Sequence, residues 1–212
     1  MAKDSQLVVD ARLCVIPPNL KLNSRSHVMQ HPRKVPMSFL TAFRHFFVVT
    51  LIFFNTAAMA DVKDTPTERR LSIPGSVRGI VMPREDWTLT REQLRPGDTA
   101  VYYMFSSERR KLFFSVYIDK TNVCQSSDTC LETALKNSQY KDAKELQKSD
   151  DGQFKIAQFF IDHPQGTPIN QTNLLASAYV DGQWFDIHIS KVGKERPEFA
   201  PLLEFLQAVV VK

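Results

Sequence analysis

The strongest constraint on the fold is a hairpin signal near the C-terminal end of the chain. Asp181-Gly182 is a two-residue sequence typical of a type I′ turn, and an alternating run of residues lies on either side of it. When Val180 is paired with Gln183, six apolar side chains fall on one face of the two strands: Leu174, Ala176, Ala178, Phe185, Ile187 and Ile189. A shift of one residue would disperse this set, so the pattern predicts a single register within an antiparallel sheet over 174–190.

The opposite face of this hairpin is the better lead to a binding surface. Tyr179 is expected to pair with Trp184 there, and Leu175 with His188. A semi-apolar patch of aromatic side chains is typical of surfaces that bind a protein or a small ligand. We therefore name Tyr179, Trp184 and Leu175 as candidate binding residues. The alternative is that a second layer, such as a helix over 129–148, covers them.

The remaining patterns predict further strands and two helices. Aromatic and β-branched runs indicate strands at 77–81, 100–105, 112–119 and 154–161. Thr129-Cys130-Leu131-Glu132 matches a capping box, which predicts a helix from Thr129 to Lys148 with a break near 138–139. Pro201 suits a first helical turn, and an apolar stripe follows at Leu202, Phe205, Leu206 and Val209. This order of elements predicts an α+β fold, with an antiparallel β-sheet packed against helices.

The segment Met37–Ala60 has the three parts of a secretory signal peptide. A basic n-region precedes the apolar run Phe46–Phe54, and Ala58-Met59-Ala60 is a small-residue cleavage site followed by polar Asp61. The 15 uncharged residues at 46–60 fall short of the roughly 20 that a membrane-spanning helix needs. We therefore expect cleavage before Asp61, a periplasmic or secreted mature protein, and no stable membrane span after cleavage.

Residues 1–36 precede this signal, although a signal peptide normally lies at the nascent N-terminus. We interpret Met37 as the true start and 1–36 as a misassigned leader; the alternative is a cytoplasmic tail before a signal anchor. Downstream of the signal, the polar stretch 61–72 is expected to be a flexible lead-in. Residues 73–212 have the length of a single domain.

The basic balance of the chain belongs to its N-terminal part. Residues 1–60 contain seven of the 27 Lys and Arg residues and two of the 23 Asp and Glu residues, so 61–212 hold 20 basic and 21 acidic residues, a net charge of −1. A nucleic-acid-binding domain normally carries a basic surface, which this region lacks overall. The remaining basic cluster, Arg109-Arg110-Lys111, lies between two expected strands and is interpreted as a solvated hairpin tip. No nucleic-acid partner is expected.

Two cysteines remain beyond the expected cleavage site, Cys124 and Cys130. An even number of cysteines in an oxidising compartment favours a disulfide. Their spacing is wider than that of zinc-binding cysteine pairs, and no matching pair of histidines follows. We predict a bridge between them that fixes the start of the helix; a metal pair and two buried free thiols are the alternatives. No metal or other cofactor is expected.

One group of residues resembles a catalytic set. Asp186, His188 and Ser190 have the side-chain types of a hydrolase triad and alternate on one strand face. Same-face neighbours on a strand lie about 6.5–7 Å apart, so Ser190 would need a sharp turn to reach His188, and no G-x-S-x-G elbow is present. His163, beside Asp162 in a loop, has no partner at metal-ligand spacing. We therefore predict no catalytic residue and interpret these side chains as structural.

The order of elements over 73–211 resembles that of exported Mog1/PsbP-like proteins. Three features carry the resemblance: Gly75, Pro83 and Trp87 before an aromatic hairpin, the late hairpin around Ala178–Trp184, and the closing amphipathic helix. The resemblance implies an α/β/α sandwich around an antiparallel sheet. It also implies roles in binding, assembly or accessory functions, and it brings no catalytic motif.

The combined expectation is an exported accessory or binding protein without intrinsic catalysis. Its partner is expected to be another exported protein or a small ligand. Two alternatives stay open: a small exported hydrolase that uses His188, and an inhibitor or immunity protein against an exported toxin or hydrolase.

Overall fold

The structure is a computed structural model that describes residues 61–120 and 122–212. The expected leader at 1–36 and the signal peptide at 37–60, with its cleavage residues, lie outside this range. Within the described residues, antiparallel sheets of four and seven strands carry two short α-helices. The protein is therefore mostly β and broadly of the α+β class, as expected. No helix among these residues has the length and apolar character that a membrane span requires.

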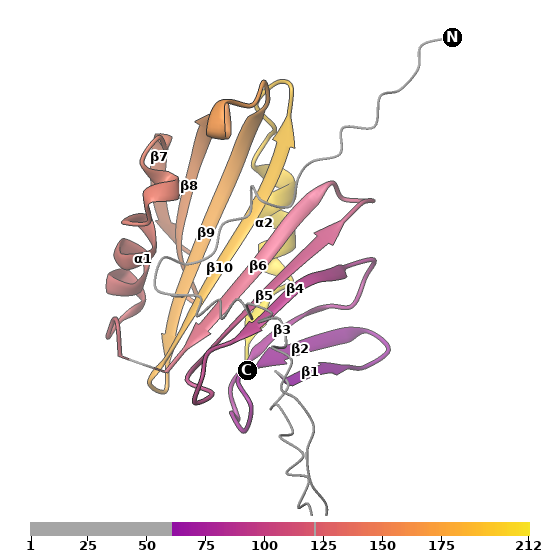
Figure 1. Cartoon of the computed structure of the whole chain (residues 1–212), viewed down its shortest axis with the longest axis vertical. Helices are drawn as coiled ribbons and strands as arrows, with labels where there is room; N and C mark the ends of the chain where they lie inside the picture. Colours follow the sequence, from indigo (N-terminus) through magenta and orange to yellow (C-terminus); the bar gives the residue numbers. More distant parts are fainter. Residues whose placement is uncertain (1–60, 121) are drawn as a thin grey trace, which may run out of the picture. The chain divides into compact units, whose positions relative to one another are not determined.

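The larger sheet has the strand order β4-β5-β6-β10-β9-β8-β7, and every neighbouring pair is antiparallel (Figure 1). Its strands are β4 (Thr88–Leu94), β5 (Ala100–Ser107), β6 (Leu112–Asp119), β7 (Lys144–Asp150), β8 (Lys155–Asp162), β9 (Asn170–Val180) and β10 (Gln183–Gly193). The smaller sheet has the order β1-β2-β3-β11. Its strands are β1 (Asp61–Asp64), β2 (Glu68–Ser72), β3 (Ile80–Pro83) and β11 (Val210–Val211).

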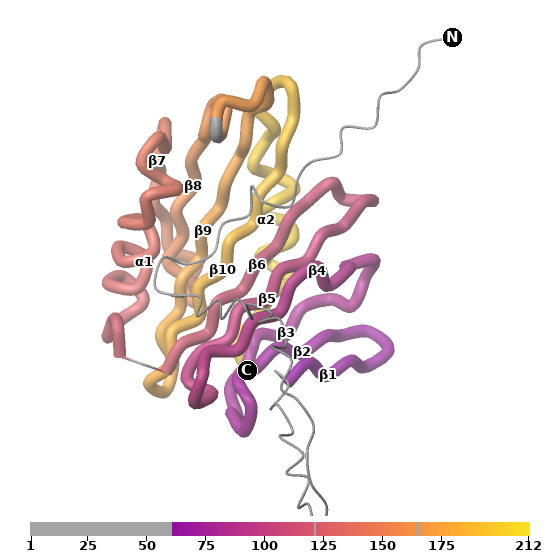
Figure 2. The backbone as a smooth tube through the Cα atoms, viewed as in Figure 1, coloured from indigo at the N-terminus to yellow at the C-terminus, as the bar shows by residue number. Residues whose placement is uncertain are grey.

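The hairpin register predicted from the sequence is confirmed. Val180 pairs with Gln183, and the β9–β10 pairing continues without a shift to the ends of both strands. Asp181 and Gly182 have φ angles of 49° and 74°, the positive values that a type I′ turn requires. Figure 2 shows this long hairpin between β6 and β8, in the interior of the sheet. Its backbone is therefore hydrogen-bonded on both sides.

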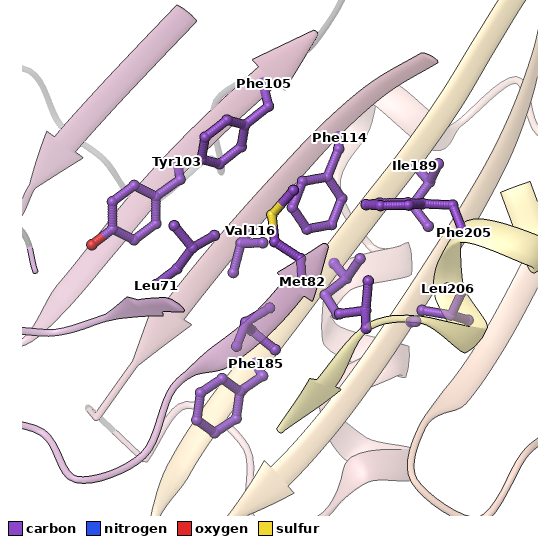
Figure 3. Packing of buried hydrophobic residues seen from close by; sticks show 14 of the residues in the cluster. Leu71, Met82, Tyr103, Phe105, Phe114, Val116, Phe185, Ile189, Phe205 and Leu206 are labelled. Carbon is purple, nitrogen blue, oxygen red and sulfur yellow. The ribbon is translucent and has the colours of Figure 1, made fainter. Parts of the chain in front are cut away.

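The apolar face of the hairpin lies in the larger of two cores. All six predicted side chains are fully buried, in one cluster with side chains of the smaller sheet and of α2 (Ala200–Gln207). Leu202, Phe205 and Leu206 form the buried face of α2, as predicted. Figure 3 shows side chains of β2, β3, β5, β6, β10 and α2 meeting in this cluster. Burial of one large apolar side chain contributes roughly 1.5–3 kcal/mol, so this core holds the small sheet and α2 on the large sheet.

The opposite face of the large sheet forms the second core, beneath α1 (Ser127–Leu135). The predicted disulfide between Cys124 and Cys130 is present, and both cysteines are buried in this cluster. The bridge links the loop after β6 to the first turn of α1, as expected. The large sheet therefore lies between α1 on one face and α2 with the small sheet on the other (Figure 1).

The helix expected over 129–148 is shorter than predicted. Its N-cap is Ser126, whose side chain accepts a hydrogen bond from the backbone N–H of Thr129, so Thr129 is the third helical residue rather than the cap. The helix ends at Leu135, a single 3₁₀ turn follows as η2 (Ser138–Tyr140), and β7 begins at Lys144. Every residue of β7 is exposed on the sheet edge. Because no face of β7 is buried, its sequence lacks apolar alternation and consists largely of residues that favour helices.

The stretch 61–72, expected to be a flexible lead-in, forms the β1–β2 hairpin instead. Arg69 forms a salt bridge with Asp64 across this hairpin (Nε to Oδ1, 2.8 Å), and Leu71 is fully buried. On its other side β2 pairs with β3, so it is an inner strand. The expected strand at 77–81 is displaced to β3, and Val77 is 84% exposed in the preceding loop.

Candidate functional site

A pocket of about 420 Å³ opens on the α1 side of the large sheet. One wall is η2 with the two residues that follow it, and another is the end of β8 with η3 (Pro164–Gly166). The base is formed by β9 and β10. These segments are distant in sequence, so the pocket exists only because the sheet brings them together. Its volume lies within the range of about 300–1,000 Å³ that is typical of small-molecule sites.

The base of the pocket is polar although it is buried. Gln171 and Asn173 alternate on one face of β9, and His188 projects from the same face of β10. Their exposed fractions are 4%, 0% and 8%. The Nε2 atom of His188 lies 2.9 Å from Oδ1 of Asn173, and Nδ2 of Asn173 donates to the backbone carbonyl of Gln171 at 3.3 Å. Buried polar groups therefore converge at the bottom of an open site.

The orientation of the Asn173 amide determines the proton position on His188. Because Nδ2 of Asn173 is directed at a carbonyl, its Oδ1 faces His188, and this oxygen can only accept. Nε2 of His188 therefore carries the proton and donates, which leaves Nδ1 of the neutral ring as an acceptor. Burial lowers the pKa of His188 to about 4. The imidazole is accordingly neutral at pH 7.

The η2 wall is held in place by ring packing. The ring of Tyr140 meets those of His188 and Phe159 edge-on, at centroid distances of 5.7 Å and 5.2 Å. The Asn137 side chain caps this turn by accepting a hydrogen bond from the backbone N–H of Gln139 at 3.2 Å. Tyr140 is buried and Gln139 is half-buried, so the wall offers one aromatic and one amide group at fixed positions.

The charged groups around the pocket are of both signs, and Asp162 among them is paired with Arg196 and Lys144. Asp162, at the end of β8, accepts hydrogen bonds from Arg196 (2.9 Å and 2.7 Å) and from Lys144 (2.9 Å). These bonds hold the pKa of the Asp162 carboxyl well below its usual range. Lys141 and Asp142 follow η2 and are both exposed. The pocket surroundings therefore carry both signs of charge in close proximity.

The three residues that resemble a hydrolase triad are not assembled as one. Asp186 accepts a hydrogen bond from Ser177 at 3.3 Å, whereas His188 bonds to Asn173. Burial raises the pKa of Asp186 to about 7, against the opposing effect of the Ser177 bond. Ser190 is 1% exposed, its hydroxyl has no hydrogen-bond partner among the described residues, and it does not line the pocket. Of the three, only His188 reaches the site.

The candidate binding residues lie beneath α1 rather than on an open face. Leu175 is fully buried, Trp184 is 8% exposed and Tyr179 is half-buried. The backbone N–H of Tyr179 donates to the side chain of Ser127 in α1 at 3.0 Å. This corrects the expectation of an exposed aromatic patch. The covering layer is the one that the sequence indicated as the alternative, although the helix is shorter than expected.

His163 joins the pocket from the opposite side. It lies in the left-handed region (φ 50°) immediately before η3, is exposed, and lines the rim, so the two histidines of 61–212 share one site. Among the described residues, no group of three or more His, Cys, Asp or Glu side chains is placed to hold a metal ion.

Sequence reasoning missed Gln139, Tyr140, Gln171 and Asn173. The sequence carried a signal for Gln171 and Asn173. Extension of the predicted hairpin register places Asn173 opposite Ser190, and Asn173 and Gln171 then share a strand face with Leu175. No such signal existed for η2, whose approach to β10 depends on tertiary packing.

The sequence matches no model of a known protein family and no curated protein. The likeness to Mog1/PsbP-like proteins therefore stays a prediction.

Proposed function

We propose that this chain is an exported accessory or binding protein without catalysis of its own, and that the pocket over β9 and β10 is its binding site. The observation that carries the proposal is a concave site with a buried, hydrogen-bonded base, in which Asn173 holds His188 in one tautomer. Preformed pockets with a few converging polar groups are typical of small-ligand sites. Of the two partner classes expected, the pocket favours a small ligand over another exported protein.

The layer order supports a Mog1/PsbP-like α/β/α sandwich as the finer description of the fold. Helices α1 and α2 pack on opposite faces of a central antiparallel sheet. The four-stranded sheet is an addition that the sequence did not indicate. Binding and accessory roles are what this resemblance implies, which agrees with the proposal. The Cys124–Cys130 disulfide supports an oxidising compartment, periplasmic or extracellular.

The test is purification from the native host, followed by mass spectrometry of small molecules that co-purify. Gln139→Trp fills the pocket, and Gln207→Trp makes the same change at an exposed position of α2 on the other side of the sheet. We expect one small molecule to accompany the wild type and Gln207→Trp but not Gln139→Trp. Retention of the same molecule by the filled-pocket variant would contradict the proposal.

A small hydrolase that uses His188 is the second candidate, and the place of this side chain favours it. A general base requires an unprotonated imidazole, and His188 lines the pocket as a neutral ring. Turnover of ester or amide substrates that disappears in His188→Gln would support this reading over simple binding. Nothing among the described residues specifically favours the inhibitor or immunity-protein alternative.

A further inference from the structure

The charges around the pocket favour an uncharged ligand. Besides the histidines, the described lining carries three charged side chains, Lys141, Asp142 and Asp162. Both oxygens of Asp162 are engaged by Arg196, and one of them also by Lys144. Lys141 and Asp142 are adjacent, exposed and of opposite sign, so water screens them. Neither an anion nor a cation would find an unopposed countercharge here.

The hydrogen-bonding groups of the pocket are mainly carboxamides. Gln139 lies on the η2 wall, Gln171 and Asn173 lie on the base, and Ser138 adds an exposed hydroxyl beside Gln139. A carboxamide both donates and accepts, as does an alcohol. A ligand with several hydroxyl groups can therefore form hydrogen bonds with Gln139 and Gln171, whereas a purely apolar ligand would cover the Gln171 amide without offering it a hydrogen bond.

Apolar groups alternate with the amides around the same pocket. Ile161 and Pro164 lie on the β8–η3 side, and the ring of Tyr140 lies on the η2 side. The ligand must therefore have apolar surface next to its hydroxyl groups. A sugar ring has this composition, because its hydroxyl groups surround two faces of C–H groups.

We propose that the pocket binds a neutral saccharide of one or two sugar residues; this rests on the proposed function, in which the pocket is the binding site. The pocket volume of about 420 Å³ lies toward the lower end of the range for small-molecule sites, which suits a ligand of that size. A peptide is the weaker match, because extended peptides commonly add to a free strand edge. The two strands that form the base of the pocket are interior strands. Strands β8 and β7 separate β9 from the nearer free edge of the sheet.

Saturation-transfer NMR on the whole protein tests the ligand class. The neutral probes are glucose, N-acetylglucosamine, cellobiose and diacetylchitobiose. Their charged counterparts are glucosamine and glucuronate, and the peptide probe is N-acetyl-alanyl-alanine amide. We expect saturation of at least one neutral sugar and of none of the charged or peptide probes. Absence of saturation for every neutral sugar would overturn the saccharide proposal.

A pair of matched variants tests whether the pocket is the place of binding. Gln139→Ala removes a lining amide, and Gln207→Ala removes an exposed amide from α2. Loss of one hydrogen bond predicts about tenfold weaker binding of the best sugar to Gln139→Ala. Gln207→Ala should bind as the wild type does. Equal affinities in all three proteins would contradict the proposal.

The saccharide proposal and the proposed function fail in different ways. Pocket-dependent binding of a charged or peptide probe, lost in Gln139→Trp but kept in Gln207→Trp, would overturn the saccharide class and retain the binding function. Co-purification of the same molecule with Gln139→Trp and with the wild type would contradict the binding function itself.

Discussion

His188 and Asp186 lie two residues apart on one face of β10, and burial shifts their pKa values in opposite directions. The pKa of His188 falls from 6.5 to about 4, so between these pH values the unfolded chain takes up a proton that the folded chain does not. This residue therefore makes stability fall as the pH falls. The pKa of Asp186 rises from 3.8 to about 7, so the folded chain retains a proton that the unfolded chain releases. That residue makes stability fall as the pH rises.

The two effects are predicted to cancel in the wild type between about pH 4 and pH 6.5. His188→Gln should leave the Asp186 effect, so that stability relative to the wild type increases as the pH falls. Asp186→Asn should leave the His188 effect and give the opposite trend. The slope of the free energy of unfolding against pH should differ from that of the wild type by at most about 1.4 kcal/mol per pH unit in each variant. Urea unfolding at several pH values measures it; wild-type slopes in both variants would contradict the burial of these groups.

Trp184 allows a test of the layer that covers it. Its ring meets that of Tyr117 edge-on at 5.6 Å, and Nε1 donates to Ser177 Oγ at 3.5 Å. Trp184→Ala should therefore lower the free energy of unfolding by about 3–5 kcal/mol, as other large-to-small core changes do. The control is Leu146→Ala on the exposed edge strand, where Leu146 is 45% exposed and a change within about 0.5 kcal/mol is expected. If Trp184→Ala had the same melting temperature as the control, the result would contradict the burial of Trp184 beneath α1.

At the level of elements, the disulfide is expected to stabilise the start of α1. The bridge closes a loop of seven residues, which corresponds to about 2–2.5 kcal/mol in the chain-entropy model. Replacement of both Cys124 and Cys130 by alanine should cost at least about 2 kcal/mol, because both side chains are also buried. Denaturant unfolding measures the loss, and the mass of the oxidised protein should be lower by two hydrogens than that of the reduced protein. Thiols that react freely in the native, oxidised protein would refute the bridge.

Elements with a regular apolar pattern on one face could be predicted from the sequence, and the exposed edge strands of the large sheet could not. The β9–β10 hairpin and the stripe of α2 each have a regular apolar pattern, since one of their faces lies in a core. β7 is exposed throughout, and β4 is mostly exposed with a register shift between Leu89 and Arg91. Such strands are held by backbone pairing to a neighbour, and this pairing leaves no pattern in the side chains.

At the scale of the whole molecule, the candidate site depends on contacts that no local pattern encodes. His188 was recognised as a chemically capable residue, but its partner Asn173 and its neighbour Tyr140 lie 15 and 48 positions away in the chain. Asn173 could have been found by extension of the hairpin register. Tyr140 could not, because the sequence predicts one longer helix in place of α1 and η2, and that helix would place Tyr140 elsewhere.

The residue that follows the expected cleavage site lies in a strand, and this gives a prediction for the processed protein. Asp61 is the first residue of β1 and pairs with Ser72, so cleavage after Ala60 would leave the small sheet intact. Cleavage a few residues later would remove the edge strand. We expect N-terminal sequencing of the exported protein to read Asp-Val-Lys-Asp.

The matched variants for this prediction are Ala60→Leu and Met59→Leu. Signal cleavage needs a small residue at position 60, so Ala60→Leu should accumulate an uncleaved precursor in the membrane fraction. Met59 lies between the two small-residue positions, so Met59→Leu should be processed as the wild type is. Immunoblots of membrane and soluble fractions separate these outcomes. A wild-type protein that keeps Met1 or Met37 at its N-terminus, or that stays in the membrane at full length, would contradict export by this signal and the periplasmic location that depends on it.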